Sequence, residues 1–203
     1  MISNQTGKLF VISGPSGTGK GTICAQLLRD LEGEGLGLSV SMTTREPREG
    51  EVDGESYFFK TREEFLEEVR QGGLLEYAET YGNYYGTPRG YVEDQLRSGH
   101  DVLLEIEMQG ALQVKRAMPG AVMIFILPPS LEELRRRIIG RGTEDEATIE
   151  LRMSQVQNEI SYIKYYDYFV INDDLDEAVH RVEEILHAEK SRITEEIAMQ
   201  FIK

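Results

Sequence analysis

The sequence predicts an α/β fold with a parallel sheet at its centre. Four short apolar runs, at 9–13, 101–106, 121–127 and 168–171, have the length and composition of buried strands. Glycines close the first run, and stretches of helical periodicity separate the runs from one another. Strands that alternate with helices are typical of parallel α/β sheets, because each parallel strand must be reached through a crossover.

Helices are indicated by apolar periodicity and by capping boxes. After the first strand, four residues share a helix face: Ile23, Leu27, Leu28 and Leu31. Residues 110–118 predict a second, shorter helix that ends before Pro119. Further helix starts are marked where a small polar residue precedes a glutamate by three places. The pairs are Thr61 with Glu64, Ser130 with Glu133, Thr143 with Glu146, and Asp174 with Glu177.

One long stretch interrupts the alternation. Residues 42–90 are rich in glycine, tyrosine, threonine and charge, and they contain strand-like pieces at 57–59 and 74–79. We expect them to form a lobe inserted between two core segments, 8–41 and 91–187.

A second interruption is shorter. Residues 141–158 are polar and begin at a glycine-flanked arginine, as a mobile lid does. The tail, 188–203, is expected to be helical, and it either extends the last helix or makes a subunit contact. Residues 1–203 are therefore expected to form a single domain.

The net charge of the chain indicates which ligands and partners to expect. Lysine and arginine number 22 against 36 aspartates and glutamates, a net charge of -14 that repels the backbone of DNA or RNA. We expect no nucleic-acid partner. Positive charge is nevertheless concentrated locally, at Arg135, Arg136, Arg137 and Arg141. These arginines either bind a small phosphate ligand or form a solvated helix face.

The composition also bears on compartment and covalent chemistry. No run approaches the roughly 18 apolar residues of a membrane span, and residues 1–8 have no apolar signal region. We expect a cytoplasmic chain without a membrane partner. The single cysteine, Cys24, is expected to be a packed side chain rather than a reactive thiol, so no disulfide forms within the chain.

A phosphate-binding loop follows the first strand. Its residues are Gly14, Pro15, Ser16, Gly17, Thr18, Gly19, Lys20, Gly21 and Thr22, and an amphipathic helix follows. Glycines allow consecutive backbone N–H groups to face a phosphate, and Lys20 adds a full positive charge. The loop predicts binding of ATP or another nucleoside triphosphate. Gly21 departs from the usual motif, whose Ser or Thr hydroxyl ligates Mg²⁺.

The rest of the chain resembles the guanylate kinases. The segments SVSMTTREPREGEVDGESYFF and LLEYAETYGNYYGTP resemble the lobe with which that family binds GMP, and LLEIEMQGA, GRGTEDE and VINDDLDEA follow in the family's order. The resemblance covers about residues 8–187. It implies a P-loop NTPase fold with a parallel five-stranded core sheet, an inserted GMP-binding lobe and a short lid. It also implies transfer of the γ-phosphoryl group of ATP to GMP.

The resemblance implies roles for individual residues. Arg45, Arg48, Tyr57 and Tyr85 would hold the GMP phosphate, and Ser41, Glu76 and Thr87 would recognise the guanine. The chemistry agrees, because arginine and phenol groups suit a phosphate dianion and a carboxylate suits the two adjacent N–H donors of guanine. Glu107 stands where aspartate is the commoner residue and would approach the GMP base.

On the ATP side, the resemblance implies that Arg137, Arg141 and Arg152 close over the triphosphate and act with Lys20 as the catalytic cations. Asn172 would contact the adenine. Glu105, expected to be a buried acid at the carboxyl end of a strand, would position a hydrated Mg²⁺ through water. Arg135 and Arg136 are expected to face solvent.

Two other readings of these motifs stay open. Related modules that have lost catalysis bind protein partners, although such modules typically lack parts of the phosphate loop. Other kinases of this type phosphorylate AMP or a sugar phosphate, and the Gly21-Thr22 pair resembles that of adenylate kinases. Whether the chain is a monomer or a homo-oligomer is not fixed by the sequence.

Overall fold

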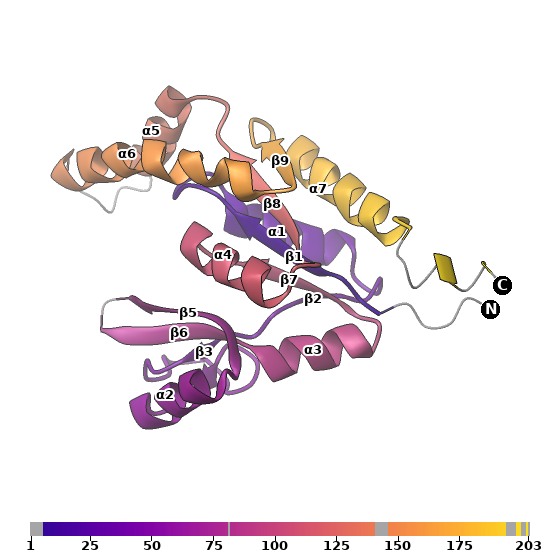
Figure 1. The fold of residues 1–203 in the computed structure, drawn as a ribbon. Coiled ribbons are helices and arrows are strands. Elements are labelled where there is room, and N and C mark those ends of the chain that lie inside the picture. Colours follow the sequence, from indigo (N-terminus) through magenta and orange to yellow (C-terminus); the bar gives the residue numbers. More distant parts are fainter. Residues whose placement is uncertain (1–5, 81, 141–145, 194–197, 200–201, 203) are drawn as a thin grey trace.

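The computed structural model describes residues 6–80, 82–140, 146–193, 198–199 and 202 (Figure 1). Its larger sheet has five strands in the order β2-β7-β1-β8-β9, and every neighbouring pair is parallel. The strands are β1 (Leu9–Ser13), β2 (Leu36–Leu38), β7 (Asp101–Glu105), β8 (Val122–Leu127) and β9 (Tyr168–Ile171). The predicted α/β fold with a parallel five-stranded core is confirmed.

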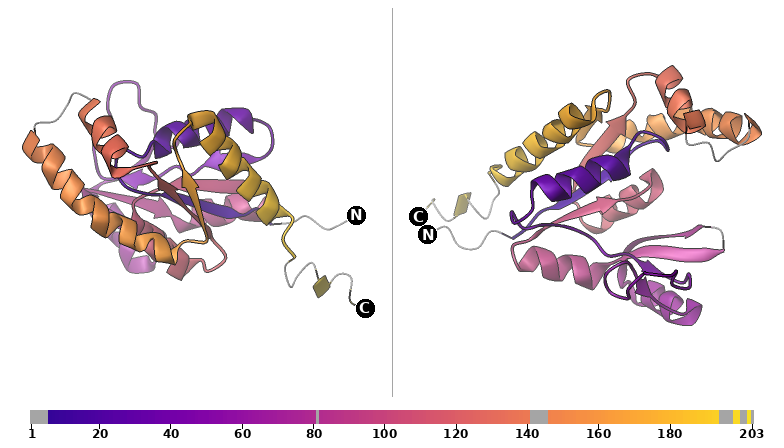
Figure 2. Two further views of the ribbon diagram at one scale, coloured as in Figure 1. Left: turned by 90° about the horizontal axis from the view of Figure 1, so that it is seen from above. Right: turned by 180° about the vertical axis from the view of Figure 1, so that it is seen from behind.

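Helices cover both faces of this sheet, which explains why its strands read as continuous apolar runs. Phe10 and Ile12 belong to the cluster that packs with α1 (Lys20–Asp30) and α7 (Leu175–Lys190). Val11 faces the opposite side, where α3 (Arg89–Arg97) and α4 (Met108–Ala117) supply the cluster. Figures 1 and 2 show these helix pairs on the two sides of the core.

A second, four-stranded sheet is formed by the stretch that was predicted as an inserted lobe. Its order is β4-β3-β6-β5, with β3 (Met42–Thr43), β4 (Phe58–Phe59), β5 (Leu74–Thr80) and β6 (Asn83–Pro88). Helix α2 (Arg62–Gln71) covers it through Phe65, which is fully buried against Met42 and Leu74. The sheet therefore has a small core of its own beside the main one.

The helix starts agree with the capping patterns where the structure describes them. Thr61 and Glu64 form a complete capping box at α2. Ser130 and Asp174 accept hydrogen bonds from the backbone N–H groups of Glu133 and Glu177. Thr143 lies outside the described residues. The predicted helix 110–118 starts earlier, at Met108 in α4, and α3 was not predicted at all.

Two helices extend the core beside the phosphate loop. They are α5 (Leu131–Gly140) and α6 (Glu146–Ile160), and the short 3-10 turn η1 (Ser161–Tyr165) leads from α6 toward β9. The two helices share a small apolar cluster that includes Leu134, Ile138, Ile149 and Val156. Of the expected lid, 141–158, residues 146–158 lie in α6 and residues 141–145 fall outside the described part.

Two further expectations concern single features. Cys24 is 2% exposed, and burial raises the pKa of its thiol to about 12, so it is a packed and unreactive side chain. Within the described ranges, no helix is long and apolar enough to cross a membrane.

Candidate active site

The glycine-rich loop joins the central strand β1 to α1. The shape of this loop requires a residue without a side chain at position 19, which is Gly19. The backbone there has a φ of +88°, and a Cβ atom would lie only 2.5 Å from Nδ2 of Asn172. That amide nitrogen donates a hydrogen bond of 2.8 Å to the carbonyl of Thr18. Asn172, expected to contact adenine, is thus also a buried support of the loop.

The Lys20 side chain turns back toward the start of the phosphate loop. Its Nζ donates to the carbonyl oxygens of Gly14 at 2.7 Å and Pro15 at 3.0 Å. Burial lowers the pKa of Lys20, while the carboxylates of Glu105 and Glu159 act in the opposite direction. A cavity of about 280 Å³ opens in front of this ammonium group, and its wall includes Gly14, Ser16, Lys20, Glu105, Glu107 and Glu159. The cavity joins a cation and a glycine-rich backbone, as a phosphate site requires.

Of the three arginines predicted to close over ATP, the structure describes the side chain of Arg137. Arg137 on α5 donates to the carbonyl of Asn172 at 2.9 Å and to Glu133 at 2.8 Å. Because Asn172 holds Thr18, this contact ties α5 to the phosphate loop. Arg152 lies on α6, but its side chain is not among those described, and Arg141 lies outside the described residues.

The two arginines expected to face solvent behave differently. Arg136 does so, with a side chain that is 80% exposed and paired with Glu133. Together, Arg136 and Arg137 lower the pKa of Glu133 to about 2. Arg135 is instead half-covered, because it forms an ion pair of 2.6 Å with Glu150 on α6. That pair links α5 to α6.

A second cavity, of about 520 Å³, lies between the smaller sheet and the core. The smaller sheet and the segments beside it contribute, among others, Ser41, Tyr57, Glu76, Tyr77 and Tyr85. All of these except Tyr77 were predicted to bind GMP. The core contributes Glu105, Glu107, Gln109, Gly110 and Gln113. Five of the eight residues expected to bind GMP therefore share one cavity, namely Ser41, Tyr57, Glu76, Tyr85 and Glu107.

Glu76 is the buried acid of this cavity. It lies on β5 opposite Thr87 of β6, and the Thr87 hydroxyl donates to its Oε1 at 2.8 Å. Glu76 is 8% exposed, and burial raises the pKa of its carboxyl group, with a smaller contribution from Glu107. Thr87 itself is fully buried behind Glu76 and does not line the cavity. The structure therefore pairs the two residues that were expected to recognise guanine.

The predicted phosphate-binding group is only partly assembled. Arg45 lies against the ring of Tyr57, 5.4 Å from its centroid, and donates to both carboxylate oxygens of Glu51 at 2.8 and 3.0 Å. Glu51 also accepts from the backbone N–H of Arg48, whose side chain is exposed. The Glu51 carboxylate therefore accepts both hydrogen bonds of the Arg45 guanidinium, the bidentate geometry that arginine also uses for phosphate.

Glu105 differs from its expectation in burial. It ends β7 as predicted, but its side chain is exposed, because it projects beyond the sheet into both cavities. A Cβ atom on Gly21 would lie 3.4 Å from its Oε1, so Glu105 stands beside the first turn of α1. Among the described residues, no group of three or more histidine, cysteine, aspartate or glutamate side chains forms a metal cage. His100, His180 and His187 are not among the residues that line either cavity.

Sequence reasoning missed several residues of the site. Glu159 reaches the phosphate cavity from α6, and Glu51 and Gln113 were not singled out. The side chain of Gln113 donates to and accepts from the backbone of Tyr77, both at 3.3 Å, so it joins α4 to β5. Only for Glu51 did the sequence hold a signal, since it is an acid within six residues of two predicted phosphate-binding arginines.

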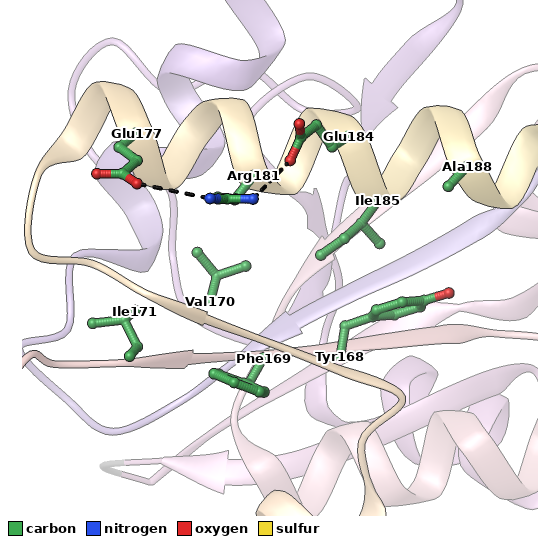
Figure 3. Close-up of a pocket in the computed structure, with 9 residues that line it drawn as sticks. All are labelled: Tyr168, Phe169, Val170, Ile171, Glu177, Arg181, Glu184, Ile185 and Ala188. Atoms are coloured by element: carbon green, nitrogen blue, oxygen red, sulfur yellow. Dashed lines mark hydrogen bonds and ion pairs between the residues drawn. The ribbon is translucent and has the colours of Figure 1, made fainter.

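A larger cavity, of about 600 Å³, lies elsewhere, between β9 and α7 (Figure 3). Phe169 and Ile171 on β9 border it and are 60% and 50% exposed. Its charged residues are already paired, because Arg181 lies 3.9 Å from Glu177 and 3.4 Å from Glu184. The cavity contains none of the predicted site residues and lacks convergent polar groups, so its size does not make it the active site.

The chain is similar to known proteins over nearly its whole length. The sequence profile described as "Guanylate kinase" matches residues 6–189. A guanylate kinase of Clostridioides difficile (strain 630) is 54% identical over 94% of this chain and 92% of its own, and that of Clostridium tetani is 51% identical over 93% and 89%. The crystal structure of guanylate kinase from Anaplasma phagocytophilum superposes with a TM-score of 0.70 at 39% identity, over 93% of this chain and 89% of that one. On this evidence, the chain belongs to the guanylate kinase family.

Proposed function

We propose that the chain transfers the γ-phosphoryl group of ATP to GMP, giving ADP and GDP. One observation carries the proposal: the phosphate-loop cavity and the cavity that holds Glu76 share a wall made of Glu105, Ile106 and Glu107. A donor in the first cavity and an acceptor in the second would therefore meet at this wall.

On the donor side, the loop 14–22 would bind the phosphates of ATP through its N–H groups. Lys20 would leave the carbonyls of Gly14 and Pro15 and neutralise the triphosphate. Arg137 would act from α5, and Arg141 and Arg152 would join it as lid residues. Asn172, which already supports the loop, would also contact the adenine.

On the acceptor side, Glu76 and Thr87 would recognise guanine together with Ser41, and Glu107 would approach the base. Arg45, Arg48, Tyr57 and Tyr85 would bind the phosphate. Phosphate entry would displace Glu51 from Arg45, so the arginine fork would exchange one anion for another. That exchange keeps the arginine paired in both states.

The residues present fit a hydrated Mg²⁺. Mg²⁺ usually keeps several waters and takes only one or two carboxylates beside the phosphates, and Glu105 offers one such carboxylate beside the loop. Gly21 supplies no hydroxyl, so the protein's contact to the ion would run from Glu105 through water. When bound, the ion would neutralise charge that develops on the phosphates.

The reaction needs little covalent help from the protein. A phosphate oxygen of GMP forms the new bond to the γ-phosphorus while the bond to the β–γ bridging oxygen breaks, and ADP leaves. Catalysis then rests on positioning, on charge neutralisation by Lys20 and the arginines, and on exclusion of water by the lobe and the lid. The net charge of -14 opposes binding to nucleic acid, and we propose a cytoplasmic location with no nucleic-acid or membrane partner.

The proposal is tested by offering ATP with a panel of acceptors: GMP, AMP, CMP, UMP and a sugar phosphate. Products are separated by chromatography, so that GDP formation is distinguished from plain ATP hydrolysis. GDP should form far faster than any other product. Faster turnover of AMP or of a sugar phosphate would establish the other kinase reading, and no turnover with any acceptor would favour the non-catalytic module.

A further inference from the structure

We propose that Gly110 is a positioning residue for guanine recognition: because it has no side chain, it allows the Glu76 carboxylate to lie close against α4, in the position from which it would accept hydrogen bonds from the base. This inference rests on the proposed function, since it concerns how the same pocket distinguishes guanine from adenine.

The close approach of α4 to Glu76 is the first part of the evidence. Gly110 is a buried residue in the first turn of α4. A Cβ atom there would lie 2.8 Å from Oε2 of Glu76, 3.3 Å from its Cδ and 3.5 Å from its Cγ. Carbon and oxygen atoms that are not bonded do not approach so closely, so a side chain at this position would force either the carboxylate or the helix to move.

The helix has little freedom to move away. The Gln113 side chain, one turn further along α4, is hydrogen-bonded to both the N–H and the carbonyl of Tyr77, the residue after Glu76. The backbone of Glu76 is itself paired in the sheet with Thr87. The carboxylate is thus the part that would shift, and its shift would strain the 2.8 Å hydrogen bond from Thr87 to Oε1.

A shifted carboxylate would affect guanine and adenine differently. Guanine offers two parallel donors, N1–H and N2–H, and accepting both requires the two oxygens to lie at matched positions. Hydrogen bonds weaken steeply when their angles depart from linear. Adenine lacks both donors, so its binding gains nothing from the position that Gly110 permits. Loss of that position should therefore lower the preference for GMP rather than activity in general.

The test compares Gly110→Ala with Gly90→Ala as a matched control. Gly90 also lies in the first turn of a helix, α3, where it is exposed and a Cβ atom would meet nothing within 4 Å. We expect Gly110→Ala to lower kcat/KM for GMP by about 10- to 100-fold, the effect of losing one or two hydrogen bonds to a charged group. The KM for ATP, kcat/KM for AMP and the Tm should stay near wild type, since alanine itself favours the helix. Gly90→Ala should match wild type throughout.

A second variant separates positioning from general damage. Glu76→Asp withdraws the carboxylate by one methylene and makes room for the new methyl group. Glu76→Asp should therefore cost less in the Gly110→Ala background than alone, which a double-mutant cycle on kcat/KM measures. If Gly110→Ala alone does not fold, comparison of the double variant with Glu76→Asp carries the test, because the added methyl group should then cost little in kcat/KM for GMP.

The outcomes separate the two proposals. Wild-type GMP-to-AMP selectivity in Gly110→Ala, or strictly additive effects in the cycle, would overturn the role of Gly110 and leave the proposed function intact. A uniform fall in Tm and in turnover of both nucleotides would overturn it too, because that result means a structural role. A wild-type protein that does not phosphorylate GMP would instead refute the proposed function.

Discussion

Among the single residues, Lys20 shows how a buried cation of the site is partnered by the backbone of its own loop. Its ammonium group is bound by the carbonyls of Gly14 and Pro15, and burial lowers its pKa. An incoming triphosphate would replace these carbonyls with full negative charges, so the binding energy of Lys20 is available to ATP rather than to GMP.

Lys20→Ala should therefore remove nearly all phosphoryl transfer and leave GMP affinity within about threefold of wild type, because GMP is expected in the other cavity and that factor is under 1 kcal/mol. Turnover and calorimetric GMP binding measure the two effects. Lys164→Ala, an exposed lysine outside both cavities, is the control. Near-normal kcat in Lys20→Ala would show that the loop does not bind the donor.

Glu76 shows the opposite situation, a buried acid for which the effect of burial outweighs the hydrogen bonds from Thr87. Burial raises the pKa of its carboxyl group above the ordinary value of 4.5. A carboxyl group whose pKa is raised by folding lowers the free energy of unfolding as pH increases from 4.5 through the raised pKa, because ionisation then opposes the folded state.

Glu76→Gln, which stays neutral, should therefore be more stable than wild type at pH 8, and the difference should shrink as pH falls through the raised pKa toward 4.5. Urea unfolding of both ligand-free proteins between pH 4 and pH 8 measures it. A difference that does not change with pH would mean that the Glu76 carboxylate is not destabilised by its surroundings.

At the element scale, α5 and α6 act as a unit beside the phosphate loop. Their shared cluster centres on Leu134 and Ile138, and both side chains would touch a Cβ atom placed on Gly17 of the loop. Arg137 adds the hydrogen bond to Asn172. The packing of this helix pair therefore also supports the loop.

Ile138→Ala should lower the free energy of unfolding by about 2–5 kcal/mol, because Ile138 is 3% exposed and its loss leaves a cavity. It should also raise the KM for ATP more than that for GMP. Ile139→Ala is the matched control, since Ile139 is the next residue and is 48% exposed. Equal effects of the two substitutions on stability would contradict the proposed packing.

Sequence patterns predicted the elements of the core better than those of the lobe. The strands buried on both faces, such as β1 and β8, stand out as apolar runs, and the capping box at Thr61 marks α2. Strands β2 and β3 have only three and two residues, which is too short for any period to show. For the site, sequence motifs identified Glu76 and Arg45 as candidates. No local pattern marks Gln113 or Glu159, because their role depends on contacts between distant elements.

At the scale of the whole molecule, the smaller sheet meets the core through α3 and α4, against which Leu75 of β5 packs. The phosphate cavity belongs to the large sheet, the second cavity lies between the two sheets, and both reach Glu105. Figure 1 shows α5 and α6 above the core strands and the smaller sheet below them, both extending to the left of the view. A ligand in the second cavity would touch both sheets and link them.

GMP should accordingly raise the Tm of the whole chain. At 100 times its Kd, a ligand adds about 2.7 kcal/mol, which corresponds to roughly 5–11 °C for a chain of this size. AMP at the same concentration should have little effect. Scanning calorimetry with each nucleotide measures the shift, and equal shifts for GMP and AMP would contradict selective binding of guanine.

We propose that the buried carboxylate of Glu76 makes this kinase selective for GMP. The most direct measurement is kcat/KM for GMP and for AMP in the wild type and in Glu76→Gln. A polar site left unpaired by the wrong base discriminates by around 10⁴-fold or more. The substitution removes the charge and turns one acceptor into a donor that suits adenine N1, so the KM for GMP should rise strongly and the GMP-to-AMP ratio should narrow, with the KM for ATP near normal. An unchanged ratio would show that Glu76 does not recognise the base.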